Sequence, residues 1–100
     1  MMYKAEFVHK ARLELLEAWE WYEDKQAGLG DRFIKEVFRV VNIIEQDHNR
    51  YPERRRYYRE ALTRVFPYLI IYRVSNRKKR IAIVAVFHTR RNPKLKFRNT

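Results

Sequence analysis

The sequence predicts an α+β domain in which a helical hairpin packs on one face of a small, twisted, mainly antiparallel sheet, in the order β-α-α-β-β-β. Two observations lead to this prediction. The hydrophobic period changes from two to the helical period near residue 9 and returns to two after residue 53. Strands that follow a helical hairpin, rather than alternating with helices, indicate an α+β arrangement. No linker or internal repeat divides residues 1–100, so a single domain is expected.

A short strand and two helices are expected in the first half of the chain. Residues 3–8 (YKAEFV) alternate in character, as in a strand with one buried face. Residues 9–26 carry apolar side chains at helical spacing, and the AGLG segment ends this helix. Asp31 is expected to cap a second helix over residues 29–48. The side chains predicted to be buried are Leu15, Trp19, Phe33, Val37, Val41 and Ile44.

Three strands are expected in the second half, after a loop that a proline interrupts. Pro67 lacks an N–H group, so its end of a strand is expected to be an edge or a bulge. The face of the sheet away from the helices is expected to be partly open and lined by basic strands and the basic tail 88–100. The expected strands are 54–62, 65–74 and 81–87, of which the last is apolar enough to be covered on both faces.

Positive charge is concentrated in the second half. The chain has 23 Lys and Arg against 12 Asp and Glu, a formal net charge of +11. Residues 1–48 hold 7 basic and 10 acidic residues, and residues 49–100 hold 16 basic and 2 acidic residues. Such asymmetry is typical of a surface that meets a polyanion or an acidic partner.

Several classes of chemistry and location are not expected. The absence of cysteine excludes disulfides and thiolate chemistry, and His9, His48 and His88 are too far apart to suggest a metal site. No glycine-rich phosphate loop is present, so neither a metal nor a cofactor is expected. No apolar run approaches about 18 residues, and the N-terminus lacks the features of a secretory signal. We therefore expect a cytoplasmic protein that does not span a membrane.

Basic side chains are the remaining candidates for a functional site. Arg59 and Arg64 flank an expected turn, while His88, Arg90 and Arg91 follow the last expected strand. In an antiparallel meander that turn lies near the end of the third strand, so these groups are expected to converge. Such a set can bind phosphate, stabilise its charge and let histidine transfer protons, which are the needs of a metal-free ribonuclease. The same set serves simple polyanion binding, which the residue types favour.

Candidate partner contacts come from one aromatic residue and from the tail. Trp21 lies off the apolar stripe of its helix, so it is expected to contact a partner rather than the core. Tyr68 and Tyr72 are expected to be structural, although tyrosines in strands can also stack on bases. The residues expected to bind a partner are Trp21, Arg90, Arg91, Lys94 and Lys96.

Four segments together resemble the RelE/ParE family of bacterial type II toxin–antitoxin toxins. The similarity covers nearly the whole chain in order and spacing, in WEWYEDKQAGLGDRFIKEV (19–37), the YPE loop, YREALTRVFPYLIIYRV (58–74) and IAIVAVFHTRRNP (81–93). The resemblance implies a growth-inhibiting toxin with the strand, hairpin and meander fold. It also implies that a co-encoded antitoxin neutralises this toxin. Because the second half of the chain is strongly basic, we expect an acidic antitoxin segment that lies across a sheet edge or the helical hairpin and covers exposed aromatics such as Trp21.

The family resemblance implies two alternative activities. One branch cleaves mRNA on the ribosome and tends to carry an arginine three residues before the tyrosine that matches Tyr72, where this chain has Leu69. That branch also uses groups from the last strand and tail, which His88, Arg90 and Arg91 match in part. The other branch poisons DNA gyrase, and the segments FPYLIIY and HTRRNP favour it. A basic binding module without toxicity is the third reading.

Overall fold

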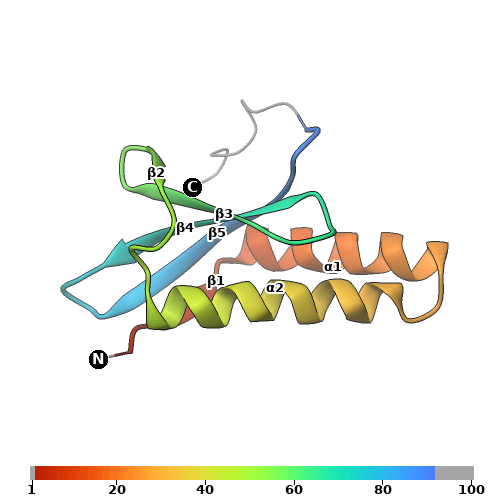
Figure 1. Ribbon diagram of the computed structural model, residues 1–100, viewed down its shortest axis with the longest axis horizontal. Coiled ribbons are helices and arrows are strands. Elements are labelled where there is room, and N and C mark those ends of the chain that lie inside the picture. The colour runs from red at the N-terminus through yellow and green to blue at the C-terminus, as the bar shows by residue number, and fades with distance from the viewer. Residues whose placement is uncertain (1, 92–100) are drawn as a thin grey trace.

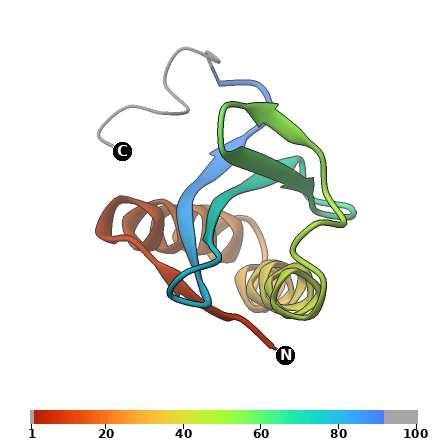
Figure 2. The ribbon, with the colours of Figure 1, turned by 90° about the vertical axis from the view of Figure 1, so that its left-hand side faces the viewer.

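A helical hairpin covers one face of a five-stranded sheet, as Figures 1 and 2 show from two directions. The structure, a computed structural model, describes residues 2–91. The strand order is β1-β5-β4-β3-β2, with β1 parallel to β5 and every other neighbouring pair antiparallel. The α+β prediction is thus confirmed. The elements are β1 (Lys4–Phe7), α1 (His9–Lys25), α2 (Leu29–Gln46), β2 (Glu53–Arg55), β3 (Tyr58–Leu62), β4 (Tyr68–Ser75) and β5 (Arg80–His88).

The turn between α1 and α2 depends on two glycines and one carboxylate. Gly28 has a φ of 88°, a left-handed conformation that glycine adopts without steric cost. A Cβ atom on Gly30 would lie 2.5 Å from the carbonyl oxygen of Trp19, so only glycine lets the two helices approach this closely. The Glu23 carboxylate accepts hydrogen bonds from the backbone N–H groups of Gly28 and Asp31, both at 3.2 Å. Glu23 therefore supplies hydrogen-bond acceptors for two backbone N–H groups at the start of α2 that lack partners within the helix.

Asp31 does not cap the second helix as the sequence analysis predicted. The cap position is Gly28, and Asp31 lies within the first turn of α2. Its carboxylate accepts a hydrogen bond from the indole Nε1 of Trp19 at 2.9 Å, which joins the two helices. The helices also end at Lys25 and Gln46, slightly before the expected ends at residues 26 and 48.

The core lies between the hairpin and the sheet. Four side chains of α2 are buried, as predicted: Phe33, Val37, Val41 and Ile44. They pack in one cluster with side chains from the sheet, which include Ile70, Tyr72, Ile83 and Val86. The predicted burial of Leu15 and Trp19 was wrong, since both are only half-buried. Leu15 packs against the core from outside, and the Trp19 indole is directed to the exposed Asp31 carboxylate. The Tyr72 hydroxyl donates a hydrogen bond to the carbonyl oxygen of His48 at 2.8 Å. Tyr72 thereby ties the segment that follows α2 to the centre of the sheet.

The expected strand 54–62 is in fact two strands joined by a tight turn. β2 and β3 form a small hairpin in which Glu53 pairs with Arg59, and Arg56 takes a positive φ of 35° at the reversal. The sequence prediction was wrong here because period-two alternation continues through the turn without glycine, asparagine or proline to mark it.

The expected strand 65–74 begins later, at Tyr68. Thr63 closes a turn over residues 63–67 by donating its Oγ1 hydrogen to the carbonyl oxygen of Phe66 at 2.6 Å. Pro67 lies in this turn, where its carbonyl oxygen accepts the Thr89 N–H. The register shift in β4 falls between Ile71 and Tyr72 instead of at the proline.

The opposite face of the sheet is more apolar than the sequence analysis predicted. A second cluster of buried side chains lies there, formed by Ile71, Val84, Ala85 and Phe87. Leu69 and Tyr58 pack against it. β5 is therefore covered on both faces, as its continuous apolar run predicted.

Candidate functional site

His88, Arg90 and Arg91 lie together where β5 ends and are called the β5 end below. The His88 Nδ1 atom accepts a hydrogen bond from the Arg90 backbone N–H at 3.0 Å, and the His88 carbonyl oxygen accepts one from the Arg91 N–H at 3.0 Å. The imidazole packs edge-to-face on the Tyr68 ring, with 5.1 Å between ring centroids. The acceptor role of Nδ1 leaves the other ring nitrogen to carry the proton when the ring is neutral.

Glu14 of α1 connects the β5 end to the helical layer. One oxygen of its carboxylate accepts a hydrogen bond from the Val86 backbone N–H at 2.9 Å. The other oxygen lies 3.6 Å from the Arg91 guanidinium and 3.5 Å from the Lys10 ammonium. Arg91 also lies over the Phe87 ring, 5.4 Å from its centroid. Arg91 is thus fixed by an ion pair and an aromatic face, while its side chain keeps 48% exposure.

A groove runs beside the β5 end, between α1 and the sheet. Its volume is about 330 Å³, and Glu17, Trp21, Tyr68 and His88 are among the residues that line it. Burial raises the pKa of Tyr68 to about 12, so its hydroxyl stays protonated at neutral pH. The groove therefore offers aromatic surface together with charges of both signs.

Trp21 is exposed, as the sequence analysis predicted. Its side chain is 56% accessible, packs edge-on against Tyr22 at 5.1 Å and has the Lys25 ammonium 4.7 Å from its ring centroid. An exposed tryptophan beside a groove is a typical partner contact. Lys94 and Lys96, the two other expected partner contacts, lie outside the described residues.

Arg59 and Arg64 do not join the β5 end. The Arg59 guanidinium donates a hydrogen bond to the carbonyl oxygen of Tyr51 at 2.6 Å. Arg64 lies in the turn between β3 and β4, where its backbone N–H donates to the Glu36 carboxylate at 2.5 Å. This turn lines a different cavity, beside α2. The β3–β4 turn itself lies beside the end of β5, as expected, because the Thr89 N–H donates to the Pro67 carbonyl oxygen at 2.9 Å. Of the five candidate catalytic residues, the structure brings His88, Arg90 and Arg91 together. Arg64 lines the cavity beside α2 instead, and Arg59 is bonded to Tyr51.

An apolar row crosses the face of the sheet away from the helices, at the position that Leu69 occupies. Leu69 on β4 pairs with Leu62 on β3 and with Phe87 on β5. The neighbouring row of paired residues on the same face consists of Glu60, Ile71 and Ala85, and it contains no cation either. These two rows therefore offer a phosphate group no cation, and the nearest one on β4 is Arg73, in the row beyond them.

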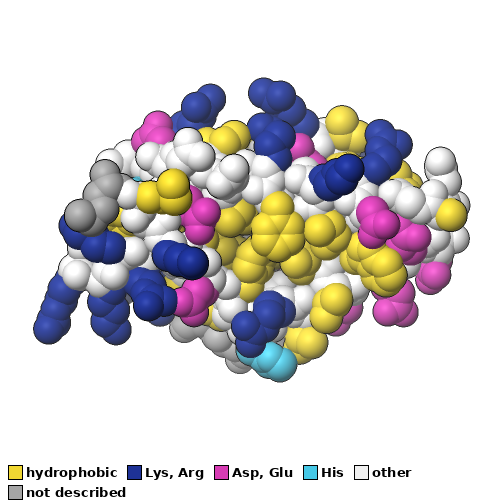
Figure 3. All heavy atoms as spheres, turned by 90° about the horizontal axis from the view of Figure 1, so that it is seen from below, with side chains coloured by type: hydrophobic (Ala, Val, Ile, Leu, Met, Phe, Trp, Pro, Cys, Tyr) yellow, Lys and Arg dark blue, Asp and Glu magenta, His cyan; other side chains and the backbone are white. Residues whose placement is uncertain are grey.

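The outer face of the helical hairpin carries a second feature, which sequence reasoning missed. Leu13 and Leu16 of α1 and Phe38 of α2 are 46%, 59% and 49% exposed, and together they are called the helical patch. Figure 3 shows hydrophobic side chains gathered along the middle of this side, with acidic side chains toward one end. The sequence contained a sign of the helical patch, because its three large apolar residues lie off the buried stripes of two amphipathic helices.

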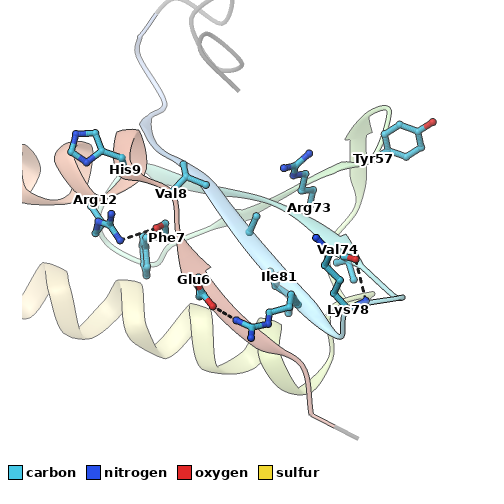
Figure 4. Close-up of a pocket in the computed structure, with 13 residues that line it drawn as sticks. Glu6, Phe7, Val8, His9, Arg12, Tyr57, Arg73, Val74, Lys78 and Ile81 are labelled. Carbon is cyan, nitrogen blue, oxygen red and sulfur yellow. Dashed lines mark hydrogen bonds and ion pairs between the residues drawn. The ribbon is translucent and has the colours of Figure 1, made fainter.

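A third feature lies where the β2–β3 and β4–β5 turns meet one end of the sheet. The arginine run 54–56, Arg73 and the run 77–80 (RKKR) are exposed there, and they are called the basic end. A cavity of about 970 Å³ adjoins it, lined in part by Arg12, Arg73 and Lys78 (Figure 4). The two runs were visible in the sequence, but their meeting depends on the hairpin at Arg56 that the sequence analysis did not predict.

Neither a metal-binding cluster nor a membrane-spanning helix is present within residues 2–91. In that part of the chain no three His, Asp or Glu side chains are grouped as metal ligands. Neither helix there is long and apolar enough to cross a membrane.

Comparisons with known proteins agree with this geometry. Residues 5–93 match a family model described as the ParE toxin of the type II toxin–antitoxin system parDE. No curated protein matches the chain. Among solved structures, the chromosomal ParDE system from P. aeruginosa has a TM-score of 0.75 and 18% identity over 87% of this chain and 96% of that chain.

Two further solved structures share the fold. The toxin–antitoxin complex RelBE2 from Mycobacterium tuberculosis has a TM-score of 0.60 and 18% identity over 88% of this chain and 99% of that chain. The isolated E. coli RelE toxin has a TM-score of 0.60 and 15% identity over 92% of this chain and 89% of that chain.

Proposed function

The chain belongs to the ParE toxin family of type II toxin–antitoxin systems, and on this premise we propose that it inhibits growth by binding DNA gyrase and that a cognate antitoxin neutralises it. The carrying observation is the apolar row of Leu62, Leu69 and Phe87 on the face of the sheet away from the helices. A leucine at this position cannot stabilise charge on a phosphate, and loss of such a group typically costs about 10²–10³ in rate. The proposal is therefore a toxin that acts by binding rather than by cleaving RNA.

The β5 end is the proposed contact with the target. Arg90 and Arg91 are exposed, and Arg91 is held in place by Glu14 and Phe87. Trp21 lines the same groove and adds a large apolar surface beside these charges. Arginine and tryptophan together are the residue types that contribute most to protein interfaces.

The helical patch is the proposed docking surface for the antitoxin. Leu13, Leu16 and Phe38 give an amphipathic partner segment three apolar anchors. The chain's net charge of +11 attracts an acidic segment to the toxin as a whole. Two of the structural neighbours come from toxin–antitoxin systems, which supports the same kind of partner for this chain.

The experiment that tests the function follows the cell after the toxin is induced without its antitoxin. We expect a DNA-damage response and intact ribosome-bound mRNA. Replacing Arg90 and Arg91 together by alanine should relieve growth inhibition while the thermal unfolding midpoint stays unchanged. The matched control replaces Arg32 and Lys35, two exposed cations on α2, and should leave growth inhibition intact.

Primer extension on ribosome-bound mRNA gives the contrary result if the proposal is wrong. Codon-positioned cuts that disappear in a His88→Ala or Arg91→Ala variant would assign the chain a ribonuclease activity at the β5 end. Growth that continues normally, with the folded toxin present at wild-type abundance, would instead indicate a non-toxic binding module.

A further inference from the structure

The basic end is assembled by the fold from segments far apart in the sequence. The register of β3 on β4 pairs Tyr58 with Arg73, so the β2–β3 turn lies at the same end of the sheet as the β4–β5 turn. β1 begins there as well, because Lys4 pairs with Arg80. Two cationic turns therefore lie at this end of the sheet, away from the β5 end, and both contribute residues to the same cavity, Tyr57 from one and Lys78 from the other.

Most of the charge around the adjoining cavity is not neutralised within the described chain. Glu6 is the carboxylate among the lining residues, and it forms an ion pair with Arg80. Within residues 2–91, no ion pair involves the side chain of Arg73 or Lys78, and both side chains are exposed. Figure 4 shows Arg12, at the start of α1, on the other side of the cavity from Arg73. The cavity is thus bordered by cations from separate elements.

The occupant that best fits this surface is a phosphodiester backbone. Separate cations from several elements suit a ligand with repeated negative charges, which a nucleic-acid strand provides. Tyr57 lines the cavity and is 76% exposed, so its ring is open to stacking and its hydroxyl to a phosphate oxygen. An acidic protein segment would need several apolar anchors, and among the described residues Tyr57 is the one exposed large apolar side chain that lines this cavity.

We propose that the basic end, with its cavity, binds the phosphodiester backbone of nucleic acid. This inference goes beyond the gyrase proposal and does not depend on it, because it concerns binding by the isolated toxin. If both hold, a toxin bound to gyrase also contacts the DNA that gyrase holds.

Fluorescence anisotropy with a labelled DNA duplex of mixed sequence tests the inference directly. We expect a micromolar dissociation constant. The logarithm of the association constant should fall with the logarithm of salt concentration at a slope of about −4, since each neutralised phosphate contributes about −0.9. The Arg73→Ala/Lys78→Ala variant should bind at least about tenfold more weakly. Its salt dependence should also be shallower, with the slope changing from about −4 to about −2. A single-stranded RNA of equal length distinguishes which nucleic acid the surface prefers.

The control variant carries the same loss of charge on another side of the molecule. Arg32→Ala/Lys35→Ala, on α2, should stay within about threefold of the wild type. Equal losses in both double variants would overturn the inference, because binding would then follow net charge alone. Loss only in Lys94→Ala/Lys96→Ala would also overturn it, by moving the contact to the tail. The inference would also be overturned if the wild-type toxin bound neither DNA nor RNA but bound poly-glutamate through Arg73 and Lys78. Circular dichroism checks the fold of each variant.

Discussion

Glu14 is the residue on which the geometry of the candidate site most depends. Its carboxylate accepts the Val86 backbone N–H and lies within ion-pair distance of Arg91 and Lys10. Its side chain is only 13% exposed, so these contacts are partly shielded from water. Glu14 belongs to the acidic half of the chain, and the sequence gives no sign that it reaches across to β5. Only the packing of α1 on the sheet reveals it.

Replacing Glu14 by alanine is expected to lower the free energy of unfolding by about 1–3 kcal/mol, because the buried Val86 N–H loses a charged acceptor. Glu14→Gln should keep most of this stability, since an amide oxygen can still accept the hydrogen bond. Urea denaturation measures both. Glu20→Ala, at an exposed position of the same helix, is the control and should change stability by less than about 0.5 kcal/mol. Equal losses at Glu14 and Glu20 would mean that this carboxylate does not hold the site.

At the scale of elements, the helices follow from the sequence and the strands follow only in part. The 3.6-residue spacing of Phe33, Val37 and Ile44 has no alternative reading, and both helices form as predicted apart from their last residues. The alternation in residues 54–62 continues through a reversal, so no local signal separates β2 from β3. Because the β2–β3 hairpin decides where the arginine run 54–56 lies, the basic end could not be predicted without it.

The same reasoning explains which candidate site residues converge. His88, Arg90 and Arg91 are neighbours in the chain, so any turn after β5 keeps them together. Arg59 was expected to join them, but its guanidinium is bonded to the carbonyl of Tyr51, in the loop that leads into the edge strand β2. A strand directs alternate side chains to opposite faces, and sequence reasoning did not decide which face Arg59 would take.

The burial of α2 can be tested with two phenylalanines on the same helix. Phe33 is fully buried, whereas Phe38 is 49% exposed. Phe33→Ala is expected to cost about 3–5 kcal/mol of unfolding free energy. Phe38→Ala should cost about 1 kcal/mol or less, because about half of this side chain is already exposed to water. Denaturant titration measures both changes. A Phe38→Ala cost as large as that of Phe33→Ala would contradict the placement of the two helix faces.

At the scale of the whole molecule, three surfaces divide the exposed chemistry. The helical patch is apolar, the basic end is cationic and the β5 end combines aromatic and charged groups. The charge asymmetry of the sequence predicted a polyanion or an acidic partner, but it could not show that cations gather at two separate places. The long-range strand pairing of β1 with β5 and the two hairpins produce that separation.

Antitoxin binding is expected to have an apolar part and an electrostatic part. Raising salt from about 0.1 to 1 M shortens the screening length from about 10 to 3 Å, so calorimetric affinity for the cognate antitoxin should fall by at least about tenfold and then level off. Leu16→Ala should weaken binding at every salt concentration. Leu62→Ala, with the same 59% exposure but on β3, should not. An affinity unchanged by salt would remove the electrostatic part of this account.

The central claim is that this toxin acts by binding gyrase, and a gyrase assay with purified components tests it most directly. Supercoiled plasmid, gyrase, ATP and the toxin are incubated together, and DNA forms are resolved after denaturing the enzyme. The account predicts broken plasmid or lost supercoiling activity with the wild-type toxin, a much weaker effect with Arg90→Ala/Arg91→Ala, and wild-type behaviour with Arg32→Ala/Lys35→Ala. Gyrase that works normally in the presence of folded toxin, while the same toxin cuts ribosome-bound mRNA, would contradict it.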